Sequence, residues 1–227
     1  NPKDLIWDSD IRPDGAAATL TFKPSDDFTW FLTPGFFALG EYRESRGDED
    51  FETLMILQGG LDADITENAY VKFGATAHIF NDVVAGGFAE SAGTNTTDIE
   101  NAYSVEAEFG LTAFPVFVGA LGQYVASDAD EDESGYLLGL KVGDKSVKAL
   151  GQWQLTYNYR SLEKNAFPDF LMDSDAFDGA TGVEGSEFEL VIGLAENVTF
   201  GIDYYRMADK NSDAEQNLLQ LDLVLKF

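Results

Sequence analysis

The chain has 227 residues, enough for one large domain, and 44% of them are hydrophobic, which excludes an intrinsically disordered protein. Acidic residues outnumber basic ones by 41 to 14, and the net charge of -27 argues against a nucleic-acid partner, whose phosphates would be repelled. Cysteine is absent, so disulfide frameworks and thiolate catalysis are excluded as well. No apolar run approaches the ~18 residues of a transmembrane helix, and a 13% aromatic content with 22 glycines favours β-structure.

Segments of about ten residues alternate between apolar and other side chains along most of the chain, as β-strands with two different faces do. They predict about eleven strands: Gly15–Lys23, Phe28–Tyr42, Thr53–Asp64, Ala69–Phe80, Tyr103–Leu111, Val116–Val125, Tyr136–Val142, Ala149–Arg160, Glu187–Ala195, Val198–Met207 and Asn217–Phe227. The connections between them alternate between short turns and long loops. No helical period interrupts this pattern.

The last segment shows most clearly that two folds are compatible with the alternating pattern. Leu219, Leu221, Leu223 and Leu225 share one face of the strand with Phe227, and the other face carries polar side chains. A soluble β-sandwich or lectin-like sheet would bury the leucines, whereas a transmembrane barrel would turn them to lipid. Nearly every strand has charged or amide residues on its second face, and burying them in one dry core would cost several kcal/mol apiece. We therefore expect a transmembrane, antiparallel, up-and-down β-barrel.

The polar face of these strands predicts the residues that line a water-filled lumen. They are Lys72, His78, Glu106, Glu108, Lys141, Gln152, Gln154, Arg160, Glu187, Glu189, Asp203 and Asp222. Both signs of charge occur, but acidic residues dominate the loops. The expected function is a porin for passive diffusion of ions and small hydrophilic solutes, with a mild preference for cations.

Nothing in the sequence indicates an enzyme. His78 is the one histidine, it falls on the polar face, and no spacing of histidines and carboxylates predicts a metal centre. No cofactor is expected, except that the acidic runs Asp48–Asp50 and Asp128–Glu133 could hold Ca²⁺ between loops.

The alternation of connections also predicts the orientation of the chain. Short turns of such barrels are periplasmic, which places Phe227 on the periplasmic side and the first domain, residues 1–14, in an external loop. Residues 15–227 form the barrel. Bacterial barrels have an even number of strands, so either further strands precede Asn1 or Lys3–Trp7 adds a short one to make about twelve.

The opening of the chain carries a more specific signal. Asn1-Pro2, Trp7-Asp8-Ser9-Asp10 and Pro13-Asp14-Gly15 resemble a segment between two strands of the "putative porin" family of Gram-negative outer-membrane proteins. The resemblance implies that the chain is the C-terminal part of a barrel of about sixteen strands that forms a homotrimer. It also implies an outer-membrane location, contact with the bilayer and lipopolysaccharide, and recognition of Phe227 by the barrel-assembly machinery.

Two segments are candidates for the constriction of the pore. The resemblance implies that Asn1–Asp14 is an external loop folded into the lumen. Trp7, Asp8, Asp10 and Arg12 would then narrow the pore. Alternatively, Trp7 anchors the loop and the aspartates cap turns. The rival is Ser161–Gly185, whose apolar side chains could plug the mouth or contact a neighbouring subunit. A plugged or structural barrel that acts as a receptor, adhesin or anchor through its loops is the alternative function, and single-channel conductance separates the two.

Overall fold

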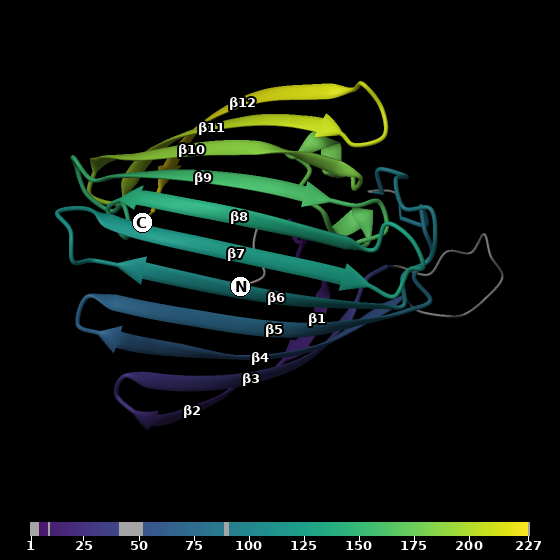
Figure 1. Cartoon of the computed structure of the whole chain (residues 1–227), viewed down its shortest axis with the longest axis horizontal. Helices are drawn as coiled ribbons and strands as arrows, with labels where there is room; N and C mark the ends of the chain where they lie inside the picture. The colour runs from purple at the N-terminus through teal and green to yellow at the C-terminus, as the bar shows by residue number, and fades with distance from the viewer. Residues whose placement is uncertain (1–4, 9, 41–51, 89–90, 227) are drawn as a thin grey trace.

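The alternating segments form one antiparallel sheet in which each strand pairs with the next along the chain (Figure 1). The structure is a computed structural model that describes residues 5–8, 10–40, 52–88 and 91–226. Its strands are β1 (Asp14–Ala17), β2 (Leu20–Ser25), β3 (Phe28–Ala38), β4 (Thr53–Thr66), β5 (Ala69–Asn81), β6 (Asn101–Leu111), β7 (Phe117–Ser127), β8 (Ser134–Gly143), β9 (Trp153–Leu162), β10 (Val183–Ala195), β11 (Val198–Asp209) and β12 (Glu215–Leu225). Two short 3₁₀ helices, η1 (Asp169–Leu171) and η2 (Phe177–Gly179), lie in the loop between β9 and β10. Within the described ranges, no helix has the length and apolar character needed to cross a membrane.

The twelve strands correspond to the eleven predicted ones, because β1 and β2 are two pieces of one strand that pairs with β3. The ladder is interrupted opposite Pro34. Its carbonyl accepts a hydrogen bond from the amide of Ala18 at 3.1 Å, but proline has no N–H with which to return one. The prediction of an all-β, antiparallel, up-and-down sheet is confirmed. The alternative strand at Lys3–Trp7 is not supported, since residues 5–7 lie in no strand; Lys3 is outside the described residues.

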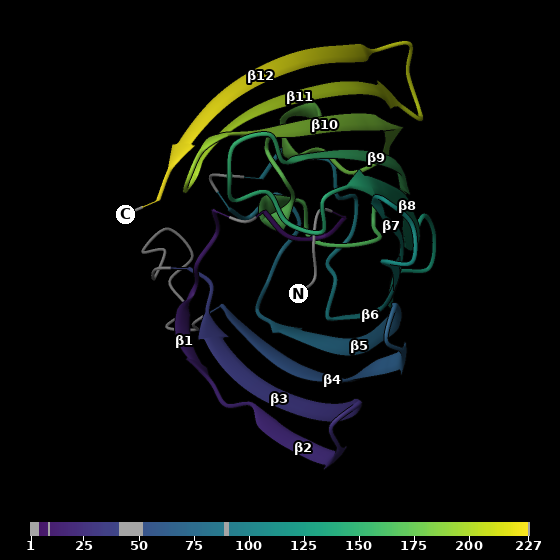
Figure 2. The same ribbon diagram turned by 90° about the vertical axis from the view of Figure 1, so that its left-hand side faces the viewer.

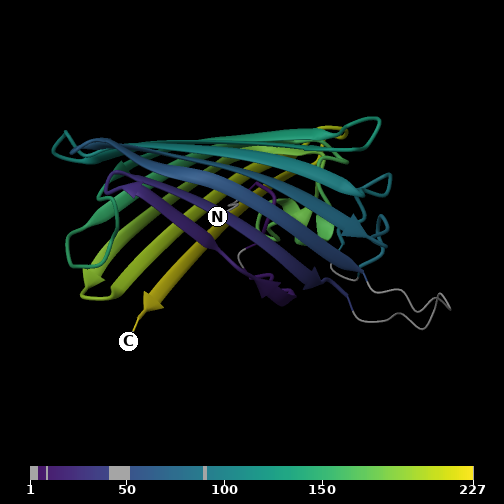
Figure 3. The same cartoon turned by 90° about the horizontal axis from the view of Figure 1, so that it is seen from below.

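The sheet curls around a concave face but does not close (Figures 2 and 3). In the described part of the chain, β12 pairs with β11 alone, and β1 and β2 pair with β3 alone. Short turns gather at one end of the strands and long loops at the other (Figure 1). Barrel closure and the count of sixteen strands therefore remain predictions.

The two faces of the sheet differ as the alternation predicts. Leu219, Leu221 and Leu223 on the convex face of β12 are about 60% exposed, and Leu138 on β8 is 58% exposed. Water would be a costly environment for so many large apolar side chains. The convex face is therefore suited to lipid.

The concave face is not uniformly polar. At the long-loop end, a core of buried apolar residues joins the strands to loops that fold inward; it contains Leu5, Ile6, Leu54, Phe80, Phe88, Ile99, Ala102, Val125, Leu137, Leu162, Ala166, Phe167, Phe170, Leu171 and Met172. The expectation that the whole second face borders water is wrong at this end. The reason is that loops far apart in the sequence bring apolar side chains into the concavity.

The start of β9 differs from the prediction by four residues. Residues 144–152 form a turn, because the Asp144 carboxylate accepts a hydrogen bond from the amide of Trp153 at 2.8 Å and Gly151 adopts a φ of 85°. The side chain of Gln152 accepts hydrogen bonds from the amides of Lys148 and Ala149, which closes this turn. Gln152 therefore braces a turn instead of lining the concave face.

Candidate functional site: a constricted cavity on the concave face

The loop between β9 and β10, residues 163–182, folds onto the concave face of its own chain. The ring of Phe167 is fully buried and makes edge contacts with His78 at 5.1 Å and Phe80 at 5.6 Å between centroids. Phe170 stacks on Phe88 at 3.8 Å. Of the two roles expected for this segment, the buried contacts favour narrowing of the mouth over contact with a neighbouring subunit. We call residues 163–182 the inserted loop.

The buried carboxylate of Asp169 ties the inserted loop to the loop before β6. It accepts hydrogen bonds from the hydroxyl of Ser91 at 2.6 Å, and from the amide and hydroxyl of Thr94 at 2.8 and 3.2 Å. The side chain of Asn95 accepts from the amide of Asp169 and donates to the carbonyls of Lys164 and Phe167. A buried loop must satisfy its polar groups in this way. The network holds the inserted loop in one position.

The segment before β1 also lies inside the curled sheet. The indole N–H of Trp7 donates to the carbonyl of Ile11 at 3.2 Å, and the amide of Asp8 donates to the carbonyl of Leu171 at 2.8 Å. The Asp8 carboxylate caps the amide of Asp10. Trp7, Asp8 and Asp10 border a small cavity of about 220 Å³, whereas Arg12 is exposed and borders none of the cavities described below. Three of the four predicted constriction residues are thus together, and Arg12 is apart from them.

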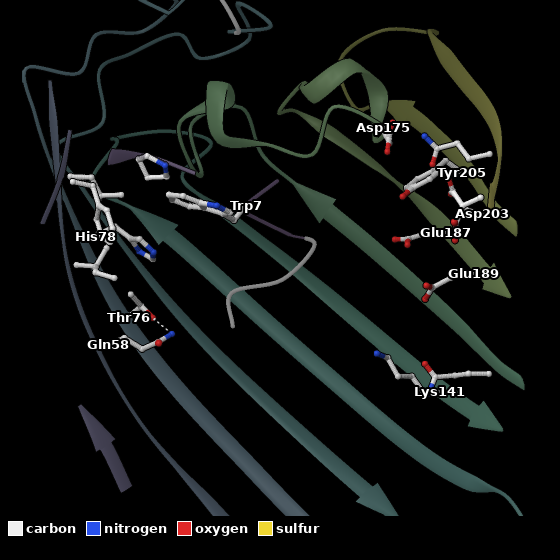
Figure 4. A pocket seen from close by; sticks show the side chains of 17 residues that line it. Trp7, Gln58, Thr76, His78, Lys141, Asp175, Glu187, Glu189, Asp203 and Tyr205 are labelled. Carbon is white, nitrogen blue, oxygen red and sulfur yellow. Dashed lines mark hydrogen bonds between the residues drawn. The ribbon is translucent and has the colours of Figure 1, made fainter. Parts of the chain in front are cut away.

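A larger cavity of about 780 Å³ lies between the two sides of the curled sheet (Figure 4). One side, from β10 to β12, carries the carboxylates of Glu187, Glu189, Asp203 and Asp222, joined by Asp175 of the inserted loop. The opposite side, from β3 to β5, carries apolar, amide, hydroxyl and imidazole side chains: Phe37, Leu54, Ile56, Gln58, Thr76 and His78. Trp7 borders the cavity as well. The cavity is therefore acidic on one side and largely neutral on the other.

Arg160 is the buried cation next to this acidic side. It is 3% exposed, and its Nη2 atom lies 2.9 Å from Glu187 Oε2, which also accepts a hydrogen bond from Asn158 at 3.2 Å. Its Nη1 atom lies 3.8 Å from the Asp173 carboxylate. Burial raises the pKa of Asp173 to about 6, although the Arg160 guanidinium acts in the opposite direction. Arg160 thus contacts the Asp173 carboxylate of the inserted loop and the Glu187 carboxylate of β10 at the same time.

A second cavity, of about 490 Å³, lies nearer the short-turn end and mixes both signs of charge. Lys72, Glu106, Glu108 and Lys145 line it, and Lys141 and Gln154 border both cavities. The hydroxyl of Tyr70 donates to Glu108 at 2.6 Å, and the Lys145 ammonium lies 4.3 Å from the Tyr70 ring.

The structure places most, but not all, of the predicted lumen residues around these cavities. His78 borders the larger cavity while being only 2% exposed, because Phe80 and Phe167 cover it. Gln152 and Arg160 border neither cavity, and Phe227 lies outside the described residues. Tyr70 and Tyr205 line cavities but were missed, although each falls in the polar register of its strand.

The acidic loops show no assembled cation site in the part that the structure describes. No group of three or more histidine or carboxylate side chains there is arranged to hold a metal ion. Asp128 accepts hydrogen bonds from the amides of Glu100 and Asn101 and from the Asn101 side chain, which ties its loop to the start of β6. Asp48–Asp50 lie outside the described residues.

Comparisons with known proteins identify the family. A search of curated proteins finds no match. Among solved structures, LpxR from Salmonella typhimurium aligns over 94% of this chain and 88% of its own, with 12% identity and a TM-score of 0.39. The family model described as "Putative porin" matches residues 84–227, more than half of the chain, although not the opening segment that carries the resemblance noted above. The chain belongs to the "Putative porin" family.

Proposed function

We propose that this chain forms the wall of an outer-membrane channel through which small hydrophilic solutes diffuse passively, with a preference for cations and without enzymatic activity. The observation that carries the proposal is the contrast between the two faces of the sheet. Large apolar side chains are exposed along the convex face, while ionisable side chains border cavities of about 780 and 490 Å³ on the concave face. Membership of a porin family supports the same function.

A continuous wall requires the free edges of β12 and of β1 and β2 to be paired. Unpaired backbone groups in a bilayer cost several kcal/mol each, so we propose that these edges are paired in the membrane. In this proposal, the channel is a barrel of about sixteen strands in a homotrimer of a Gram-negative outer membrane. The lipopolysaccharide leaflet would meet the long-loop end.

Cation preference follows from the charges around the larger cavity. Five carboxylates border it, those of Asp175, Glu187, Glu189, Asp203 and Asp222, whereas Lys141 is the one ammonium along the same described lining. A cavity walled by one sign of charge concentrates the opposite ion. The narrowest part would be set by the inserted loop together with Trp7, Asp8 and Asp10.

Single-channel recording in planar bilayers tests this function. We expect discrete conductance steps, and in a KCl gradient a reversal potential of the sign that K⁺ permeation gives. Anion selectivity would contradict the proposed preference.

A plugged barrel that works through its external loops is the second candidate function. The observation that favours it is the buried, hydrogen-bonded inserted loop, which fills the long-loop end of the concavity. Reconstituted protein that shows no conductance, with its strands intact by circular dichroism, would support this second function and refute the channel.

A further inference from the structure

The carboxylates of β10, β11 and β12 gather on one side of the larger cavity. Glu189 lies directly across the strand ladder from Asp203. Asp203 is also within electrostatic reach of Glu187, Asp222 and Asp175. In the described ranges, neither Asp203 nor Asp222 makes a salt bridge or a side-chain hydrogen bond. The carboxylates on this side of the cavity would attract a cation that enters it.

An independent observation on the opposite side of the cavity points to a ligand. His78 is 98% buried and its Nδ1 atom has no hydrogen-bond partner among the described residues. Its ring borders the cavity on the side away from the acidic residues (Figure 4). An unpaired buried nitrogen is unfavourable, so a ligand group that donates a hydrogen bond to it, or accepts one, would be favoured.

The surface between these two polar sites is apolar. Phe37, Leu54 and Ile56 border the cavity, and Ile56 lies directly across the strand ladder from His78. Trp7 borders the same cavity from the segment before β1 (Figure 4). A simple metal ion would gain nothing from this lining. An organic body would gain from the removal of its apolar surface from water.

We propose that the cavity of about 780 Å³ is a binding site for amphipathic organic cations, with the ammonium or guanidinium group at Glu189 and Asp203, the apolar body against Phe37 and Ile56, and a polar group at His78. This inference rests on the proposed function, for it names the class of solute that the channel would select. The site is specific for charge at one side and for a hydrogen-bonding group at the other.

Calorimetric titration of the detergent-solubilised full chain tests the site with three small molecules of similar size. Tyramine carries an ammonium and a hydroxyl group, phenethylamine carries the ammonium alone, and 4-hydroxyphenylpropionate reverses the charge. We expect tyramine to bind most tightly, phenethylamine more weakly and 4-hydroxyphenylpropionate not at all.

Variants test the acidic end and the His78 end of the site independently. Asp203→Asn removes one of two facing carboxylates without adding strain, and should weaken tyramine about tenfold, as the loss of one charge-assisted hydrogen bond does. His78→Phe keeps a ring against Phe80 and Phe167, and should weaken tyramine while leaving phenethylamine unchanged. Glu184→Gln is the matched control, since Glu184 is an exposed carboxylate on the convex face of the same strand as Glu187. It should change neither affinity.

Equal binding of tyramine and 4-hydroxyphenylpropionate would overturn the inference, as would equal effects of Asp203→Asn and Glu184→Gln. Conductance measured on the same preparation keeps the two proposals distinct. A protein that conducts ions but does not bind tyramine would refute the proposed binding site but not the proposed channel. Binding without conductance would support the site and refute the channel.

Discussion

At the scale of single residues, Arg160 is the cation that joins the inserted loop to the sheet. It is buried, it pairs with Glu187 of the wall, and it faces Asp173 of the inserted loop. Its Nε atom has no partner within the described part of the chain, so the guanidinium is held by its Nη groups. A buried pair of this kind contributes little net stability, but removal of one partner leaves a charge stranded in a medium that solvates it poorly.

Arg160→Met should therefore destabilise the chain by about 3–5 kcal/mol, because it leaves the Glu187 carboxylate buried without its cation. The midpoint of thermal unfolding in detergent, followed by circular dichroism, measures this loss. Adding Glu187→Leu to the same variant should restore part of the stability. Arg206→Met, at an exposed position on β11, is the control; a shift as large as that of Arg160→Met would contradict the account.

Asp173 should make the docking of the inserted loop dependent on pH. Burial raises its pKa from the usual value of 3.8 to about 6, so the folded state holds the proton more tightly than the unfolded chain does. The resulting stabilisation is complete below about pH 3.8 and is lost as the pH rises through about 6. Asp173→Asn has no carboxyl group to ionise, so the variant does not lose stability as the pH rises. Its thermal midpoint should therefore rise relative to that of the natural chain between pH 4 and pH 7. A constant difference over that range would show that Asp173 ionises normally.

In the proposed channel, the inserted loop is the element that narrows the passage along the concave face. Its apolar residues pack on β5 through Phe167, and its polar groups are bonded to the loop before β6. The residue that joins these two loops is Asp169, which is 2% exposed. The loop is therefore a fixed part of the wall.

Asp169→Ala should release this element, since it leaves the donors of Ser91 and Thr94 without their acceptor. Each buried donor left unpaired costs about 1–3 kcal/mol, so amide exchange at Thr94 and Asn95 should accelerate about 10- to 100-fold. Hydrogen exchange followed by mass spectrometry provides the measurement. Ser174→Ala, in the exposed part of the same loop, should leave these rates unchanged. Unchanged exchange in Asp169→Ala would show that other contacts hold the loop.

The sequence predicts the strands well because each strand repeats its two-residue period for about ten residues, as in Ala69–Asn81 and Glu215–Leu225. It fails at the start of β9, where Gly151 and the side chain of Gln152 build a turn that the alternating pattern hides. It also cannot show that the inserted loop turns inward. The contact between Phe167 and His78 joins residues about ninety positions apart, and no local pattern encodes such a pairing.

In the proposed channel, the whole molecule is a wall with one face for lipid and one for water. On β12, Leu219, Leu221 and Leu223 are exposed on the convex face, while Gln220 and Asp222 border the cavity on the other. All other claims about the channel depend on this division. If the concave face were dry, the carboxylates around the cavity would be too costly to keep ionised.

Thiol labelling along β12 tests this division most directly, because the natural chain has no cysteine and gives no background. Single variants Leu219→Cys, Gln220→Cys, Leu221→Cys and Asp222→Cys are reconstituted in lipid vesicles and treated with a charged, membrane-impermeant thiol reagent. We predict modification at positions 220 and 222 and protection at 219 and 221. Labelling that is uniform along the strand, or strongest at 219 and 221, would contradict a lipid-facing convex side and a water-filled concave side.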